Sequence, residues 1–324
     1  MVKFLLPSAS SYASATYDGK LIFYLGKTVN VYDTSIREKV AMIPRLGNSQ
    51  IAVSRDNAFV GCIHPTSRVV EAVLLRMNNP PKEMFRIPLR GSFHSCAPCF
   101  TYDNNYLLVT VGYPKVVIYA IEVSTGTVFS MYETTETSTI SNLIVTAKGI
   151  IAVEHESLLP SIDCPSAKFL LFQTVFSSPV EICFDKRTCD SLRKELKSSF
   201  FWSGAVELTQ EKLLLFYKYA SHTAETRFEV RSLQYEPTFR PAPNIIIPYF
   251  LSLPPVVTTD GKYVAFIGKL SKQTGDFICV YQTADWSPAL IEHQKYVWDL
   301  HFIPNTYDLI VSGEKSYVLT INVP

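Results

Sequence analysis

Short apolar runs alternate with polar turns along the whole chain, and the same order of residue types returns several times. In the clearest copies a Ser or Thr stands two residues before an Asp-Gly or Asp-Asn pair, and an apolar run follows; these copies begin at Thr16, Ser54, Thr101 and Thr258. The runs are rich in Val, Ile, Tyr and Phe and are bounded by Gly, Pro, Asn and Asp, which is typical of β-strands. The run after each turn lacks polar alternation, as in Leu21–Leu25, which indicates a strand covered on both faces.

The repeat returns about every 40–50 residues, with one longer interval, and this period is typical of propeller blades. Three weaker copies, at Thr146, Thr209 and Pro304, bring the number of units to seven. A propeller blade needs four strands, and the first unit supplies them at residues 11–17, 20–26, 28–34 and 39–45. We therefore expect each unit to fold as one small antiparallel sheet.

The two ends of the chain predict how the ring closes. The last unit supplies only three strands, at 297–304, 308–313 and 316–323, whereas residues 2–6 form a strand with no unit of their own. Pairing these segments completes the last blade and removes open sheet edges. The sequence thus predicts an all-β, seven-bladed β-propeller of four-stranded antiparallel blades, with one domain over residues 1–324. The blades are expected to begin near residues 11, 49, 95, 140, 203, 254 and 297.

These units resemble WD-repeat propellers. The third predicted strand ends as Val31–Thr34 or Val280–Thr283, and the last unit carries Trp298 and Asp299 ahead of Leu309–Gly313. The Gly-His pair of that family is absent from every unit, and the Trp-Asp pair stands in a first strand instead of closing a third one. The side-chain network of the family is therefore not transferred to this chain. The resemblance implies a ring-shaped binding platform, usually without catalysis. Such propellers often sit inside larger proteins, including signalling proteins with a nucleotide-triphosphatase module.

Charge and composition narrow the function classes. Thirty basic and 29 acidic residues give a formal net charge of +1, which argues against a strong nonspecific grip on nucleic acid or on an anionic membrane. No apolar run approaches the roughly 20 residues of a membrane-spanning helix. Seven cysteines and no Asn-x-Ser/Thr sequon favour a reduced, cytoplasmic protein. Secretion is the alternative, because Met1–Leu6 and Ala13-Ser14-Ala15 partly imitate a signal peptide.

Two short motifs could carry chemistry, and both have a structural interpretation. Cys96 and Cys99 have the spacing of a redox pair or half of a zinc site, but we interpret them as structural thiols. Glu154-His155-Glu156 falls in a predicted strand, where the histidine opposes both carboxylates. No nucleophile elbow, phosphate-binding loop or zinc-protease motif occurs. We therefore predict no catalytic residues, no cofactor and no metal site.

Two segments interrupt the regular repeat. Residues 157–165 form an insertion with Asp163 and Cys164, which fits either a recognition loop or a tolerated insertion. Residues 185–199 place Leu192 and Leu196 four apart behind Asp190, which predicts a short surface helix.

The remaining candidates lie in the predicted loops between blades and between second and third strands, which share one face of such a propeller. Arg, Tyr and Trp in these loops are the usual anchors of protein interfaces. We expect a noncatalytic scaffold that binds a protein or peptide there, with no nucleic acid and no membrane insertion. The alternatives are a propeller hydrolase with axial carboxylates or a metal, and a ligand-sensing propeller of a larger signalling nucleotide triphosphatase. The candidate contact residues are Arg45, Arg90, His94, Tyr113, Trp202, His222, Tyr249, Phe250 and Tyr296.

Overall fold

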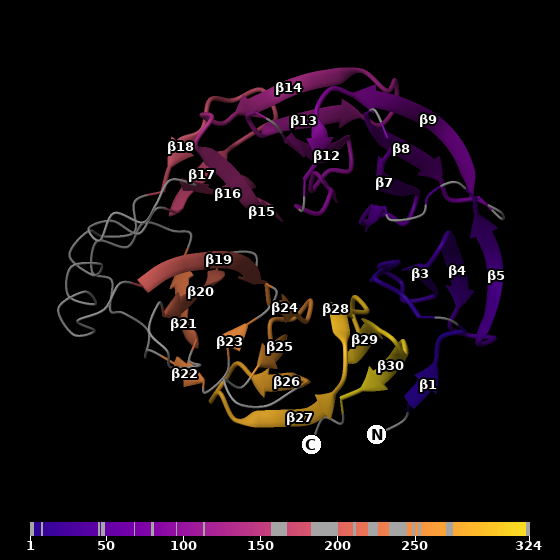
Figure 1. Ribbon diagram of the computed structural model, residues 1–324, viewed down its shortest axis with the longest axis vertical. Coiled ribbons are helices and arrows are strands. Elements are labelled where there is room, and N and C mark those ends of the chain that lie inside the picture. Colours follow the sequence, from indigo (N-terminus) through magenta and orange to yellow (C-terminus); the bar gives the residue numbers. More distant parts are fainter. Residues whose placement is uncertain are drawn as a thin grey trace.

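Seven antiparallel sheets stand side by side around a central axis, each with its first strand innermost (Figure 1). This computed structural model describes residues 3–7, 9–44, 46, 49–67, 69–78, 81–94, 96–112, 114–156, 167–182, 200–209, 212–219, 226–232, 245–247, 250–251, 254–269 and 275–321. The all-β, seven-bladed propeller predicted from the repeats is confirmed. No helix among the described residues is long and apolar enough to cross a bilayer. The predicted helix at 185–199 and the insertion at 157–165 lie outside the described residues.

The first three blades follow one another along the chain. Blade one consists of β2 (Tyr12–Ala15), β3 (Leu21–Leu25), β4 (Val29–Asp33) and β5 (Glu38–Ile43). Blade two consists of β6 (Gln50–Val53), β7 (Phe59–Pro65), β8 (Val70–Arg76) and β9 (Lys82–Leu89). Blade three consists of β10 (Ser92–Phe93), β11 (Cys99–Phe100), β12 (Tyr106–Gly112), β13 (Val117–Glu122) and β14 (Val128–Glu133).

The other four blades complete the ring. Blade four consists of β15 (Ser138–Thr146), β16 (Gly149–Glu156), β17 (Ala167–Phe172) and β18 (Val180–Glu181). Blade five consists of β19 (Phe200–Thr209), β20 (Lys212–Tyr219), β21 (Thr226–Ser232) and β22 (Ile245–Ile247). Blade six consists of β23 (Phe250–Leu251), β24 (Val256–Val257), β25 (Tyr263–Lys269), β26 (Asp276–Gln282) and β27 (Pro288–Gln294). Blade seven consists of β28 (Val297–Phe302), β29 (Asp308–Gly313), β30 (Tyr317–Thr320) and β1 (Lys3–Leu5).

The first strand of blade three differs from the continuous strand expected over 95–101. β10 and β11 both pair with β12, and an irregular segment separates them. Within it the Cys96 N–H donates to His94 Nδ1 at 3.2 Å and so is taken out of the ladder. Pro98 has no N–H to offer. The same sheet position is split in blade six, where Pro254 and Pro255 stand between β23 and β24.

Ring closure occurs through the N-terminal strand, as predicted. β1 pairs antiparallel with β30, with Phe4 opposite Val318, and the Leu6 N–H donates to the Ser316 carbonyl at 2.9 Å. Ser316 Oγ also accepts the Ser10 N–H at 2.9 Å. Figure 1 shows β1 beside β30 and both chain ends on the same side of the ring. The two ends of the chain are therefore joined by buried hydrogen bonds as well as by the strand pair.

The repeated turn owes its sequence to a small set of hydrogen bonds. In blade two the Ser54 hydroxyl donates to Asp56 Oδ1 at 2.6 Å and accepts the Phe59 N–H at 2.9 Å. Asp56 Oδ1 also accepts the Ala58 N–H at 3.0 Å. Asn57 has a φ of 60°, a left-handed conformation that Gly and Asn adopt most readily. The corresponding Thr–Asp bonds and left-handed residues occur at Thr101, Asp103 and Asn104 and at Thr258, Asp260 and Gly261.

Candidate functional site

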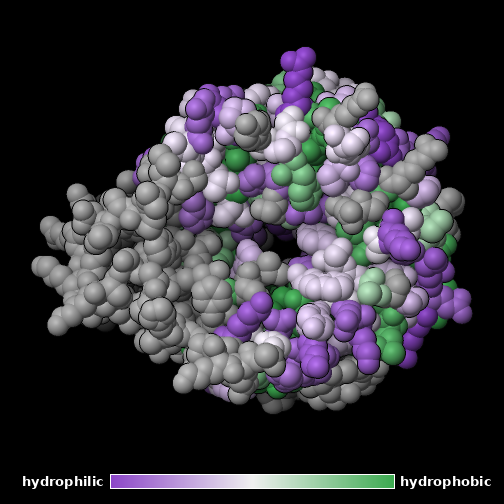
Figure 2. Space-filling view, in the orientation of Figure 1, coloured by the Kyte–Doolittle hydropathy of each residue, from purple (hydrophilic) through white to green (hydrophobic). Residues whose placement is uncertain are grey.

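Among the described residues, three cavities open at the end of the ring where first strands turn into second strands. The first, of about 260 Å³, lies against the ends of the innermost strands β2, β6, β11, β15 and β28. A second, of about 480 Å³, lies between blades three and four, and a third, of about 330 Å³, lies at Asp260 and Tyr307 of blades six and seven. Figure 2 shows that the molecule is hollowed at the centre of the ring. We call the first the axial cavity and the second the groove.

Arg55 is the cation of the axial cavity. Its guanidinium carbon lies 4.5 Å from the centre of the Tyr102 ring and 5.6 Å from that of Tyr17, which places it within cation–π range of both. Nη2 donates to the Val145 carbonyl at 3.5 Å and lies 3.9 Å from a carboxylate oxygen of Glu207. Nε and Nη1 have no hydrogen-bond partner in the part of the chain that the structure describes. The four partners come from four other blades, so only the closed ring assembles this group.

Asparagine side chains of neighbouring turns hold the backbone of these residues. Asn57 Oδ1 accepts the Tyr17 N–H at 2.6 Å, and Asn104 Oδ1 accepts the Arg55 N–H at 2.9 Å. In each pair the acceptor belongs to the next blade. The repeated turn therefore does two things, because its left-handed residue closes the turn and also fixes the preceding blade at the axis.

Two titratable side chains with shifted pKa values, Asp299 and His301, lie on the innermost strand of blade seven. Asp299 and His301 are two residues apart on β28 and so share a face, and Asp299 Oδ2 accepts the Ala13 N–H at 3.4 Å. Burial raises the pKa of the Asp299 carboxyl to about 7 and lowers the pKa of His301 to about 4. Burial and the nearby Asp299 charge also raise the pKa of Tyr12. Near neutral pH, His301 and Tyr12 are uncharged and Asp299 is divided between its two forms.

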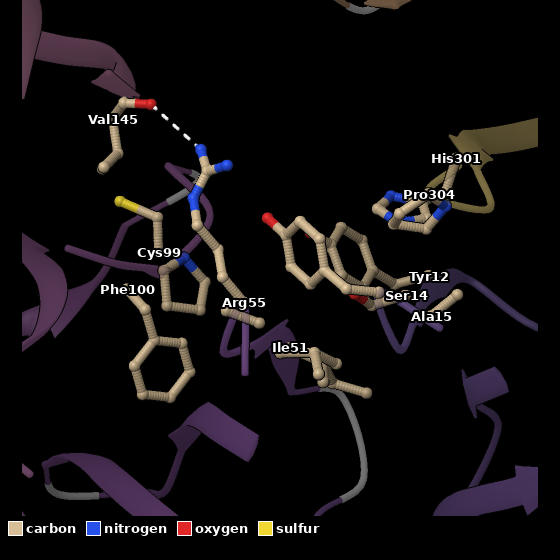
Figure 3. Close-up of a pocket in the computed structure, with 14 residues that line it drawn as sticks. Tyr12, Ser14, Ala15, Ile51, Arg55, Cys99, Phe100, Val145, His301 and Pro304 are labelled. Carbon is tan, nitrogen blue, oxygen red and sulfur yellow. Dashed lines mark hydrogen bonds between the residues drawn. The ribbon is translucent and has the colours of Figure 1, made fainter. Parts of the chain in front are cut away.

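The wall of the axial cavity carries one fixed charge. Fourteen described residues line it, and Arg55 is the only one among them that is charged near neutral pH (Figure 3). Figure 3 also shows Arg55 and His301 approaching the cavity from opposite sides. The other lining side chains are small, aromatic, aliphatic or uncharged polar groups. The cavity is therefore suited to a ligand group that accepts hydrogen bonds from a guanidinium.

The groove lies next to the axial cavity. Val145 lines both, and Tyr102, which stacks on Arg55, lines the groove. Phe176 forms its outer wall: this ring is 65% exposed and packs edge-on against Tyr106 at a centroid distance of 5.8 Å. Because Tyr106 already holds this exposed ring in place, an apolar group of a ligand can pack against Phe176 without first having to fix its position.

The structure describes only some of the contact residues predicted from the sequence. Arg90 is exposed directly after β9, and Tyr296 is 58% exposed in the turn before β28. Trp202 lies on β19 and Phe250 on β23. Arg90 and Tyr296 lie at the end of the blades opposite the three cavities, in different parts of the ring. The remaining predicted contacts lie outside the described residues: Arg45, Tyr113, His222 and Tyr249.

His94 is a tether between two blades. Its Nδ1 accepts the Cys96 N–H at 3.2 Å, so the proton of the neutral ring is on Nε2, which lies 2.9 Å from Thr139 Oγ1 of blade four. Burial lowers the pKa of His94, which favours this neutral form. The half-buried ring thus has a structural role in addition to its predicted place on the rim.

The two motifs with possible chemistry have structural surroundings. Cys96 and Cys99 are free thiols, and burial raises the pKa of both, that of Cys96 to about 12, so they are not thiolates near neutral pH. Glu154 accepts the Tyr132 hydroxyl at 2.9 Å, whereas His155 lies 2.8 Å from Ser141 in its own blade. Within the described ranges, no three His, Cys, Asp or Glu residues are grouped as a metal ion would require.

Sequence reasoning missed Tyr17, Arg55 and Tyr102, although each stands inside the repeat. Each is the residue between the Ser or Thr and the Asp of its turn. The flanking residues make the turn and are nearly constant, whereas this position has no role in the turn and varies. A variable position inside an otherwise constant turn is the signal that could have identified them.

Solved structures share the fold at very low sequence identity. The β-propeller domain of Cps50 (Swd1) from Myceliophteria thermophila has a TM-score of 0.68 at 9% identity and covers 99% of this chain and 100% of that chain. The WD40 repeats of RRP9 give 0.62 at 10% identity, covering 99% and 97%. An oligogalacturonate lyase in complex with manganese gives 0.70 at 8% identity, covering 99% and 91%. No protein-family model and no curated protein matches the sequence. The chain has a divergent WD-repeat-like propeller fold, and the structures that share it include WD40 propellers and an oligogalacturonate lyase.

The raised pKa of Asp299 predicts that the stability of the fold depends on pH. Its folded pKa of about 7 lies above the ordinary value near 4, so the unfolded chain loses this proton at lower pH than the folded chain. Stability from this group is therefore lost as the pH rises from about 4 to about 7. Asp299→Asn keeps an acceptor for the Ala13 N–H and does not titrate. We expect the variant to match the wild type near pH 4 and to be more stable by about 1–2 kcal/mol at pH 8, less than the full shift implies because the side chain is only half-buried.

Urea unfolding at several pH values between 4 and 8 measures this difference directly. His301 lies on the same face of β28 as Asp299, and its pKa is lowered rather than raised. It is therefore the residue with which Asp299 is compared. A free-energy difference between Asp299→Asn and the wild type that stays constant over this range would contradict the assigned titration.

Proposed function

We propose that this chain is a noncatalytic propeller that binds a protein or peptide partner. The observation that carries the proposal is the group at the axis, where Arg55 lies between Tyr17 and Tyr102 and the groove continues to Phe176. Arginine and aromatic side chains are enriched where proteins bind one another, especially when they are already ordered. The fold likeness to WD40 propellers supports the same class of function. As part of this proposal, the cysteine content and the lack of sequons favour a cytoplasmic location.

Two faces of the ring are candidates for the contact. The axial cavity and groove occupy one, and the predicted loops with Arg90 and Tyr296 occupy the other. Affinity capture with the full chain, followed by quantitative mass spectrometry, separates them with two paired variants. Arg55→Gln with Phe176→Ala alters the first face, and Arg90→Ala with Tyr296→Ala alters the second.

We expect one variant to lose captured partners that the other keeps. Both variants should retain the wild-type unfolding midpoint, because the four side chains are exposed or half-exposed. Capture of the same proteins at the same level by the wild type and by both variants would count against a partner on either face, and no specific capture would count against the function itself.

A propeller hydrolase is the alternative function, and one observation favours it. Asp299 and His301 share a face at the axis and have pKa values shifted toward each other's ordinary range, as acid–base pairs in active sites often do. If this pair acted on a substrate, Asp299→Asn would abolish turnover without weakening partner capture. Loss of capture in Arg55→Gln with no measurable hydrolysis by the wild type would favour the binding function.

A further inference from the structure

The axial cavity presents the donors of one cation, Arg55, to a ligand. Arg55 cannot lose its charge under ordinary conditions, and two of its nitrogens, Nε and Nη1, have no partner among the described residues. The aromatic contacts and the Val145 carbonyl hold the guanidinium in place. A ligand therefore meets a cation that has already lost much of its side-chain freedom, which reduces the entropic cost of binding.

Glu207 does not neutralise this cation completely. Its carboxylate is 3.9 Å from Arg55 Nη2, longer than a hydrogen bond, and it does not line the axial cavity. Burial raises the pKa of Glu207, and Arg55 offsets only part of that rise. The Arg55 side chain remains 32% exposed. An incoming carboxylate can thus approach the guanidinium from the cavity side, with Glu207 as a competitor behind it.

The groove favours a ligand group of a different kind from the acidic group that suits the axial cavity. Phe176 and Tyr102 supply exposed apolar ring surface. The one carboxylate on the groove, Asp103, already accepts the Thr101 hydroxyl and both the backbone and side-chain N–H groups of Asn105. Because that carboxylate has its partners and is negative, the groove favours an uncharged apolar group over a second acidic one. Val145 lines both cavities, so they are adjacent and one extended chain can reach both.

We propose, building on the function proposed above, that this face binds an extended peptide through two of its side chains. An acidic side chain of the peptide accepts hydrogen bonds from Arg55 in the axial cavity. A bulky apolar side chain of the same peptide packs against Phe176 in the groove. The partner is thus a protein with an exposed, extended segment in which an acidic residue stands near a Leu or an aromatic residue.

Synthetic peptides test this directly. The probes are short, fluorescein-labelled Ser/Gly peptides with blocked ends, each carrying one Glu and one Leu at several separations, so that the Glu side chain is the only carboxylate. Fluorescence anisotropy with the full chain measures the dissociation constant. We expect at least one separation to bind, and its Glu→Gln counterpart to bind at least about tenfold more weakly, since hydrogen bonds between charged groups are lost.

The variants are chosen for opposite effects. Arg55→Gln should weaken the Glu peptide about tenfold or more and leave the Gln peptide unchanged, whereas Glu207→Gln should strengthen the Glu peptide by removing the competing carboxylate. Phe176→Ala should weaken the Leu peptide but not its Leu→Ala counterpart. Arg37→Gln is the matched control, because Arg37 also lies over an aromatic ring, that of Phe4 at 5.6 Å, but away from the axis. Unchanged unfolding midpoints show that each variant is folded.

Each other outcome overturns the inference. Equal affinity for the Glu and Gln peptides, no effect of Arg55→Gln, or no binding by any peptide of the set would exclude the proposed ligand. Weaker binding by Glu207→Gln would point to a cationic ligand instead. If partner capture is lost in the Arg55→Gln with Phe176→Ala variant while no such peptide binds, the proposed function stands and this inference fails.

Discussion

Leu6→Ala is expected to lower the free energy of unfolding by about 2–5 kcal/mol, the range for a Leu side chain removed from a packed core. Leu6 follows β1 and is 5% exposed. It packs in a cluster that joins blades one and seven, with Ile22 and Ile310 among its members. The substitution therefore weakens the seam where the ring closes. Denaturant unfolding, followed by tryptophan fluorescence and circular dichroism, measures the loss.

Leu5 provides the matched control one residue away. It is 72% exposed, and substitution of an exposed side chain usually changes stability by no more than about 0.5 kcal/mol. A large cost at Leu6 with almost none at Leu5 is the pattern that the pairing of β1 with β30 requires. Equal effects at both positions would mean that the N-terminal strand is not docked in solution, and the closure of the ring would then need another explanation.

Gly61→Ala is expected to lower the free energy of unfolding by about 1–3 kcal/mol, because the site between blades two and three has no room for a methyl group. A Cβ on Gly61 would lie 2.4 and 2.7 Å from the two methyl carbons of Leu107. Leu107 is 1% exposed and packed on all sides, so it has little freedom to move away. The lower flexibility of alanine in the unfolded chain offsets only part of this cost.

A double-mutant cycle with Leu107→Ala shows whether the two residues meet. Leu107→Ala alone should cost about 2–5 kcal/mol. The double variant should be more stable than the sum of the two losses by about 0.5–3 kcal/mol, because the new methyl group fills part of the cavity. Gly112→Ala is the control: its Cβ would lie 3.5 Å from its nearest neighbours, an ordinary contact. Additive losses in the cycle would show that blades two and three do not pack as described.

Leu6 and Gly61 both lie at apolar contacts between neighbouring blades. Each blade alone has two apolar faces, and a sheet of four short strands cannot cover both. Neighbouring blades cover them, as the mixed cluster of Phe23, Val31, Val60 and Val73 shows for blades one and two. Only the two terminal blades would keep an uncovered face in an open arc, which is why the seam at β1 and β30 matters for the whole ring.

The sequence was sufficient to predict the fold because its signals are local. The hydrogen bonds that close the repeated turn connect residues no more than five apart, as between Ser54 and Phe59, so their residue types recur visibly in the clearest copies of the repeat. The broken first strands were not foreseen, because His94 withdraws the Cys96 N–H from the ladder through a side-chain contact that no strand pattern reveals.

The proposed binding face could not be predicted from the sequence in the same way. The sequence predicts contacts in the loops between blades and between second and third strands, and the exposed residues found there, Arg90 and Tyr296, stay predictions. The cavities lie at the other end of the blades, where turns are short and regular. The sequence did not point to these cavities, because the nearly constant residues of a regular turn are explained by the turn itself.

The sequence by itself determined that strands and turns repeat seven times, because the bonds that close each turn join near neighbours. It also determined that the N-terminal segment completes the last sheet, because the last unit supplies only three strands of its own. The tertiary structure alone decided that Arg55 lies between Tyr17 and Tyr102, next to Val145 and Glu207. Those residues belong to five blades. Tyr17, Arg55 and Tyr102 hold equivalent positions in the repeat, but nothing in the sequence shows that their side chains meet each other or Val145 and Glu207. They meet because closing the ring brings the inner ends of the blades around one axis, where side chains that are free of any role in the turn become neighbours.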